Sequence, residues 1–205
     1  FVSPRWVPQL ADADEVMGCV KRRPDVEYSA VVPNMMGWDR AHSAKVDCVA
    51  VLASASETFS LRNTNADIEA SFTRIEPVIA AAVAAGVKVR GYVSCAIKCP
   101  FEGEVPVAAV REVSARLLSL GVDELSLADT IGAAEPSDIG PLLEAMGDLI
   151  APADVILHLH DTRGTALACV MEAMKLGVRR FDAAAGGLGG CPYAPGAPGN
   201  LATEQ

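Results

Sequence analysis

The sequence predicts an α/β protein in which helices cover a parallel sheet, and three observations lead to this class. From residue 26 onward, strand-like and helix-like segments alternate at intervals of roughly 25–30 residues, the length of one strand-plus-helix unit. The strand-like segments are continuous apolar runs, as strands buried on both faces require. The helix-like segments end on glycine, which favours helix termination. With 51% hydrophobic residues and no internal linker, residues 1–205 are expected to form one domain.

The expected elements follow one another along the chain. Strands are predicted at residues 1–3, 27–33, 48–56, 88–96, 124–129, 154–161 and 179–187. Helices are predicted at residues 37–46, 67–85, 105–121, 135–150 and 163–177. Asn65 or Asp67 can cap the second of these helices, which stops at Gly86. Pro136 suits the first turn of the helix at 135–150.

The strand count favours a (β/α)₈ TIM barrel over an open sheet. A closed barrel takes eight strands and about 250 residues, so seven predicted strands leave this chain one unit short. An open doubly wound sheet usually carries a glycine-rich turn after its first strand, and none is seen near the N-terminus. Polar residues follow several strands, among them Asn34, Ser94, Asp129 and His160, and barrel sites are built at such strand ends.

Composition limits the partners. The formal net charge is −9 and no Lys/Arg block exceeds residues 21–23, so no nucleic-acid partner is expected. No apolar run reaches the roughly 18 residues that span a bilayer, so no membrane segment is expected. The six cysteines lack the paired spacing of a zinc site and the density of a disulfide scaffold, which favours a reducing compartment.

The strand "VILHLHD" is the most specific local feature. Residues two apart in a strand point to the same face, so His158 and His160 are expected to project together at its carboxyl end. Two imidazoles on one face are half of a first-row metal site. The alternative is that His158 is a core histidine and His160 a loop residue.

Two further residues are candidates for chemistry. Asp129 stands where the strand "ELSLAD" gives way to a loop, and it serves either as a cap of the turn or as a catalytic carboxylate. Cys191 lies in "GGLGGCPYAPGAPGN", where nine of fifteen residues are Gly or Pro, so it does not belong to the core. A thiol on such a loop can act as a nucleophile or as a general acid/base.

A resemblance covers essentially the whole chain. The segments "PNMMGW", "SASETFSLRN", "VRGYVSCAIKCPFEG", "ELSLADTIG", "HLHDTRGTALA" and "GGLGGCPYAPGAPGNLATE" resemble the hydroxymethylglutaryl-CoA lyases, a family of metal-dependent barrel lyases. The resemblance implies one catalytic TIM-barrel domain over residues 1–205, incomplete because its first β/α unit and its C-terminal region are missing. It places a ligand Asp, an Arg and a Glu before Phe1, which is not Met, so we expect the protein to begin earlier.

The resemblance also implies residue roles. His158 and His160 match two metal ligands, and Asn200 matches a further ligand through its side-chain oxygen. Cys191 matches the catalytic thiol, and Asp129 a carboxylate that assists proton transfer. Weaker candidates for substrate contact complete the set: Asn63, Arg90 and Tyr92.

The implied activity is the cleavage of 3-hydroxy-3-methylglutaryl-CoA to acetyl-CoA and acetoacetate, a step of leucine catabolism and ketone-body formation. The resemblance implies Mg²⁺ or Mn²⁺ as cofactor, with Zn²⁺ as an alternative, a CoA thioester as substrate, and a homodimer in the bacterial cytoplasm or the mitochondrial matrix. Two alternatives stay open. One is a condensing enzyme of the isopropylmalate or homocitrate synthase type, or a hydroxy-keto-acid aldolase. The other is a non-catalytic metal-binding chain.

Overall fold

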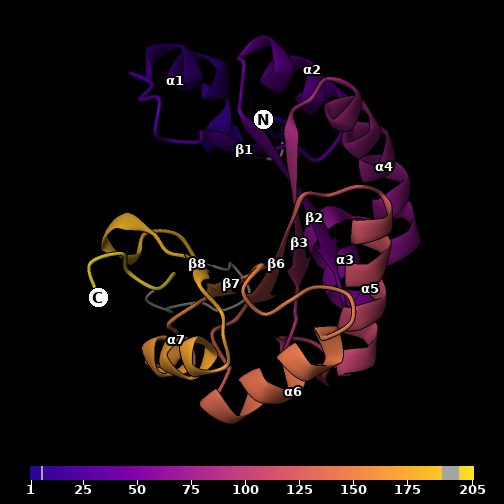
Figure 1. The fold of residues 1–205 in the computed structure, drawn as a ribbon. Helices are drawn as coiled ribbons and strands as arrows, with labels where there is room; N and C mark the ends of the chain where they lie inside the picture. The colour runs from indigo at the N-terminus through magenta and orange to yellow at the C-terminus, as the bar shows by residue number, and fades with distance from the viewer. Residues whose placement is uncertain (6, 191–198) are drawn as a thin grey trace.

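The centre of the protein is a curved sheet of parallel strands, seen in a computed structural model that describes residues 1–5, 7–190 and 199–205 (Figure 1). The described sheet has six strands in the order β1-β2-β3-β6-β7-β8, all paired in parallel. They are β1 (Ser29–Val31), β2 (Cys48–Ser54), β3 (Lys88–Ser94), β6 (Glu124–Asp129), β7 (Val155–Leu159) and β8 (Arg180–Asp182). Spatial order follows chain order, which is the arrangement of a barrel wall.

Helices alternate with these strands and lie on the outer side of the sheet, where α4, α5, α6 and α7 follow its curve (Figure 1). The helices are α1 (Ala13–Cys19), α2 (Met35–Ser43), α3 (Glu57–Thr64), α4 (Ile68–Ala84), α5 (Val107–Ser119), α6 (Pro136–Met146) and α7 (Ala166–Lys175). Two short 3₁₀ segments are η1 (Pro8–Leu10) and η2 (Ala185–Gly187). Of the helices that the structure describes, none has the length and apolar character needed to cross a membrane.

Most predicted elements are confirmed, and the differences have local causes. Residues 1–3 form no strand; the amino group of Phe1 donates a single hydrogen bond to the Val31 carbonyl, at 2.8 Å. Helix α3 was not predicted, and it begins because the Ser56 hydroxyl accepts a hydrogen bond from the Phe59 N–H. A short antiparallel hairpin, β4 (Lys98–Cys99) with β5 (Gly103–Glu104), was also not predicted.

Strand alternation divides the side chains of the sheet between two faces. Val155, Leu157 and Leu159 of β7 belong to the hydrophobic core that the sheet forms with the helices. The residues between and beyond them, including His158 and His160, point to the concave face. The fold therefore separates an apolar outer layer from a polar inner face, and the inner face carries the candidate site.

Candidate functional site

His158 and His160, here called the imidazole pair, lie together at the carboxyl end of β7. Their Nε2 atoms are 3.2 Å apart, so the prediction that the two side chains project together is confirmed. His160 is 7% exposed, and burial, followed by the neighbouring His158, lowers its pKa from 6.5 to about 4. At neutral pH His160 is therefore neutral, with a ring nitrogen lone pair available to a ligand.

Asn200 reaches this site because its backbone pairs with the end of β7. His160 and Asn200 form an antiparallel bridge, flanked by hydrogen bonds from Asp161 N to Gly199 O at 2.9 Å and from Leu201 N to Leu159 O at 3.1 Å. Residues 199–201, here called the strap, are thus fastened to β7 by main-chain contacts.

The Asn200 side chain is oriented by one hydrogen bond and leaves its oxygen free. Its Nδ2 donates to the Leu188 carbonyl at 2.8 Å. Among the described residues, the buried side-chain N and O atoms without a partner are His160 Nδ1, Thr162 Oγ1 and Asn200 Oδ1. Two of these three atoms belong to the site, and a buried polar atom without a partner is costly unless a ligand completes it.

Glycine is required where the chain passes close to the strap. Gly199 has φ +105°, and a Cβ atom there would lie 1.9 Å from the Gly189 carbonyl oxygen. The backbone N–H of Asn200 donates to that same carbonyl, at 3.2 Å. The glycines therefore allow the close crossing that sets Asn200 beside His160.

A cavity of about 300 Å³ opens beside the imidazole pair. His158, His160 and Tyr92 line it together with Ser94 and Thr130, and the rest of its wall comes from small and aliphatic residues. Burial raises the pKa of the Tyr92 phenol to about 12, so it stays protonated as a hydrogen-bond donor. The cavity gives an organic substrate access to both imidazoles.

Below the cavity, Asp182 and Arg90 support His158. Asp182, the last residue of β8, accepts from His158 Nδ1 at 3.1 Å, and Arg90 contacts its other carboxylate oxygen at 3.2 Å. Burial would raise the pKa of Asp182, but the His158 hydrogen bond and Arg90 outweigh it and lower that pKa. Asp182 was not identified from the sequence. The only available signal was a polar residue inside an otherwise apolar strand prediction.

Arg90 and Asn63 do not line the cavity, whereas Tyr92 does. The Arg90 guanidinium is held by Glu124, at 2.6 Å, and by Asp182. Asn63 is exposed on α3 and lines a small adjoining pocket that shares Leu52 and Ser94 with the main cavity. Substrate contact by these residues stays a prediction.

Asp129 lies on the other face of the sheet from the imidazole pair. It alternates in phase with Leu125 and Leu127, which belong to the core, and it is 2% exposed. Its two oxygens accept hydrogen bonds from the Ala133 and Ala134 N–H groups, at 3.0 and 2.9 Å. Burial raises its pKa in spite of these bonds. The structure thus shows Asp129 capping the turn, and a catalytic role stays a prediction. Cys191 lies outside the described residues.

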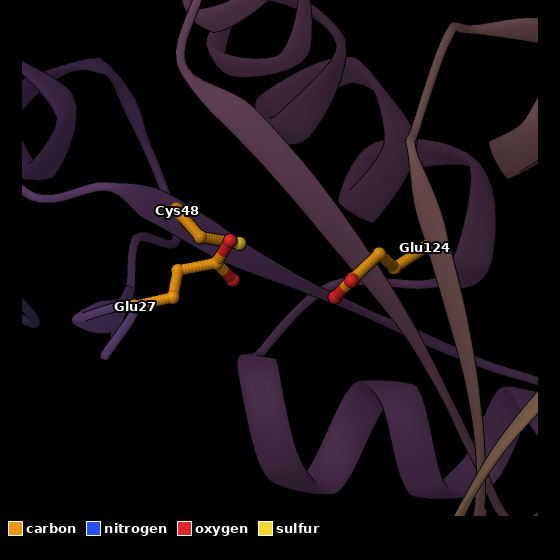
Figure 2. Close-up of side chains that lie close together, drawn as sticks. All are labelled: Glu27, Cys48 and Glu124. Carbon is orange, nitrogen blue, oxygen red and sulfur yellow. The ribbon is translucent and has the colours of Figure 1, made fainter. Parts of the chain in front are cut away.

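A second polar cluster lies at the opposite end of the strands and comprises Glu27, Cys48 and Glu124, here called the amino-end cluster (Figure 2). Its three ligand atoms lie within 4.8 Å of one another. Both carboxylates are already paired, Glu27 with Lys88 and Glu124 with Arg90, each at 2.6 Å. Burial, followed by Glu27, raises the pKa of the Cys48 thiol to about 11, so the thiolate that binds metals is not formed. This cluster is a poorer cation site than the imidazole pair.

The imidazole pair and Asn200 fit a divalent cation. Two ligands of one octahedral ion with bonds of about 2.1 Å lie about 3 Å apart, which agrees with the 3.2 Å between the Nε2 atoms. The free Asn200 Oδ1 supplies an oxygen donor beside them. Mixed imidazole and oxygen donors suit first-row metals and Mg²⁺.

Fold and site together define a parallel (β/α) barrel with a histidine-asparagine centre at the carboxyl ends of its strands. The profile of the HMGL-like family matches residues 6–205. The chain belongs to the HMGL-like family.

Similar proteins of known name are lyases. The chain is 50% identical over all its 205 residues to the hydroxymethylglutaryl-CoA lyase of Pseudomonas mevalonii, of which it covers 68%. Other curated relatives are named as cytoplasmic and mitochondrial mammalian forms, and the chain spans 60–63% of those. These names confirm the predicted resemblance and its class, the carbon–carbon lyases, over the condensing enzymes.

Solved structures confirm the barrel fold. An HMG-CoA lyase from Brucella melitensis superimposes with a TM-score of 0.95 at 48% identity, covering 99% of this chain and 72% of that one. An HMG-CoA lyase from Acinetobacter baumannii, in complex with coenzyme A and 3-methylmalate, matches with a TM-score of 0.94 at 38% identity. That match covers 100% of this chain and 67% of that one.

Proposed function

We propose that the protein cleaves 3-hydroxy-3-methylglutaryl-CoA into acetyl-CoA and acetoacetate, and that residues 1–205 belong to its single catalytic barrel domain. The observation that carries the proposal is the 50% identity to a hydroxymethylglutaryl-CoA lyase across the whole chain. The imidazole pair beside a 300 Å³ cavity agrees with it. Because the chain spans 60–68% of its curated relatives, the activity is that of the whole protein.

The cofactor in this proposal is Mg²⁺ or Mn²⁺, held by His158, His160 and Asn200, with Zn²⁺ as the alternative. A bound divalent cation would supply Lewis-acid stabilisation of negative charge on the substrate oxygen. The neutral His160 and the free Asn200 Oδ1 need no deprotonation before they bind it. His158 is held in place by Asp182.

The reaction breaks the bond between the hydroxyl-bearing carbon and the carbon next to the thioester. The hydroxyl group loses a proton and becomes the keto group of acetoacetate, while the thioester carbon gains a proton and becomes the methyl group of acetyl-CoA. Cys191 is the proposed donor of that second proton. Tyr92, which stays protonated and lines the cavity, is proposed to contact the substrate.

Asp129, Arg90 and Asn63 have indirect parts in this proposal. Asp129 assists proton transfer through the turn that it caps. Arg90 acts on the interior side, through Asp182. Asn63 is proposed to contact the distal part of the CoA thioester from the adjoining pocket.

The partners in this proposal are a CoA thioester and a second copy of the chain. The Acinetobacter baumannii lyase was solved with coenzyme A, which supports a CoA substrate here. We place the homodimer in the bacterial cytoplasm or the mitochondrial matrix, since six cysteines without paired spacing favour a reducing compartment. Size-exclusion chromatography with light scattering tests the dimer.

An acetoacetate assay tests the activity. The full-length protein is stripped with EDTA, supplied with 3-hydroxy-3-methylglutaryl-CoA, and assayed after separate additions of Mg²⁺, Mn²⁺ and Zn²⁺. We expect no product in EDTA and restored product with Mg²⁺ or Mn²⁺. Condensation of acetyl-CoA with a 2-oxo acid, without acetoacetate release, would contradict the proposal and favour the synthase alternative. Inactivity with every cation would favour a non-catalytic chain.

A further inference from the structure

Asp182 is the best-connected carboxylate of the inner face among the described residues. Its Oδ2 accepts from His158 Nδ1 at 3.1 Å and from the Ser126 hydroxyl at 3.3 Å. Its Oδ1 faces the Arg90 guanidinium at 3.2 Å. The side chain is 18% exposed, and the backbone register sets Asp182 directly beside His158 on the neighbouring strand.

A carboxylate at this position determines which ring nitrogen of His158 carries the proton. A neutral imidazole has one N–H, and an ionised carboxylate only accepts hydrogen bonds. The contact with Asp182 therefore keeps the N–H at Nδ1 and leaves the lone pair at Nε2. That Nε2 is the atom facing His160, at 3.2 Å.

We infer that Asp182 is a positioning residue that fixes the tautomer and ring orientation of His158, so that Nε2 is presented to the cation site. The inference deepens the proposed function, because it rests on His158 as a ligand. A carboxylate that orients a ligating histidine raises metal affinity by holding the ligand in its binding geometry.

Arg90 completes this arrangement from the interior side. Its guanidinium joins Asp182 to Glu124, whose Oε2 lies 2.6 Å from Arg90 Nε. A buried carboxylate needs such a partner, since an unpaired charge is costly away from water. Arg90 therefore holds Asp182 ionised and in place without touching the cavity.

The test compares Asp182→Ala, which removes the acceptor, with Asp182→Asn, which keeps an acceptor oxygen but loses the charge. Asp148→Asn is the matched control, because Asp148 has a 75% exposed side chain on the outer surface. All are made in the full-length protein. Circular dichroism checks folding, and if Asp182→Ala is unfolded, Asp182→Asn decides alone.

Two readouts are used. In the metal-free protein, imidazole ¹⁵N NMR should show His158 protonated at Nδ1 in the wild type and in the control, with the Nε2–H tautomer gaining population in Asp182→Ala and, less, in Asp182→Asn. Mn²⁺ titration followed by EPR should show affinity reduced about 10- to 100-fold in Asp182→Ala, with a smaller loss in Asp182→Asn.

A folded Asp182 variant with the wild-type tautomer, or with wild-type Mn²⁺ affinity, would overturn the inference. The tautomer readout needs neither cation nor substrate. A failed acetoacetate assay therefore tells against the proposed function alone, and an unchanged tautomer tells against the role of Asp182 alone.

Discussion

The two ends of the parallel strands carry polar clusters that meet the cost of burial in different ways. At the amino end, Glu124 contacts both Arg90 and Arg180, and Glu27 pairs with Lys88. At the carboxyl end, the imidazole pair is uncharged in part, and His160 Nδ1 and Asn200 Oδ1 have no partner. One end is satisfied within the protein, while the other leaves donor atoms free for a ligand.

This difference teaches how to choose between candidate metal sites. Both clusters bring potential ligand atoms close together, so proximity alone does not separate them. Partners do separate them, since a carboxylate already paired with a cation has less to gain from a metal ion. The predictions below test the contrast by altering each end in turn.

The largest effect is expected from Cys191→Ala. If the thiol transfers a proton, turnover should fall about 10³-fold, within the usual range for a general acid/base, while Mn²⁺ affinity is retained. Steady-state acetoacetate release and EPR titration measure the two quantities. Cys19→Ala is the control, because Cys19 is exposed on α1. Near-normal turnover in Cys191→Ala would remove the thiol from the mechanism.

His158→Ala should weaken Mn²⁺ binding by at least about 100-fold, since losing a ligand costs no less than losing the group that orients it. Isothermal titration calorimetry measures the affinity. The matched control is His42→Ala, because His42 is exposed on α2, away from the strand ends. Equal affinities in the two variants would place the cation elsewhere.

Glu124→Gln should affect stability instead of catalysis, by about 2 kcal/mol at neutral pH, because it weakens charged hydrogen bonds to Arg90 and Arg180. Burial would raise the pKa of Glu124, but those two arginines outweigh it and hold the pKa below 4.5. A lowered carboxylate pKa contributes stability that is present above 4.5 and is lost as pH falls through the folded pKa. Urea unfolding should therefore show a gap between wild type and variant that closes below about pH 4. A gap independent of pH would contradict this account.

Glu27→Gln should have the smallest effect, because the Glu27–Lys88 pair is largely exposed, with 30% and 56% of the two side chains accessible. We expect unchanged Mn²⁺ affinity and no measurable shift of the thermal midpoint. Calorimetry checks both. A loss of Mn²⁺ affinity in this variant, with His158→Ala unaffected, would reverse the comparison and make the amino-end cluster the cation site.

Much of the fold was predictable because apolar strands and glycine-ended helices are local signals. The six strands of the sheet coincide with predicted segments, and Asp67 caps α4 through a hydrogen bond to Ala70 N. Helix α3 was missed because its first turn continues a stretch that reads as strand, and its capping Ser56 is an ordinary serine in the sequence.

The site was partly predictable from strand alternation. The two-residue spacing of His158 and His160 places them on one face, as found. The same rule places Asp129 with Leu125 and Leu127 on the opposite face, a signal available in "ELSLAD". Asp182 could not be identified in this way, because its role depends on contacts with residues 24 and 92 positions away.

The backbone attachment of the strap has a consequence for altering the centre. Because main-chain hydrogen bonds hold residues 199–201 against β7, the location of residue 200 does not depend on its side chain. Exchanging Asn200 for Asp or His would then vary donor charge and softness at a constant position. The strap is thus a fixed mount on which cation preference can be tuned one donor at a time.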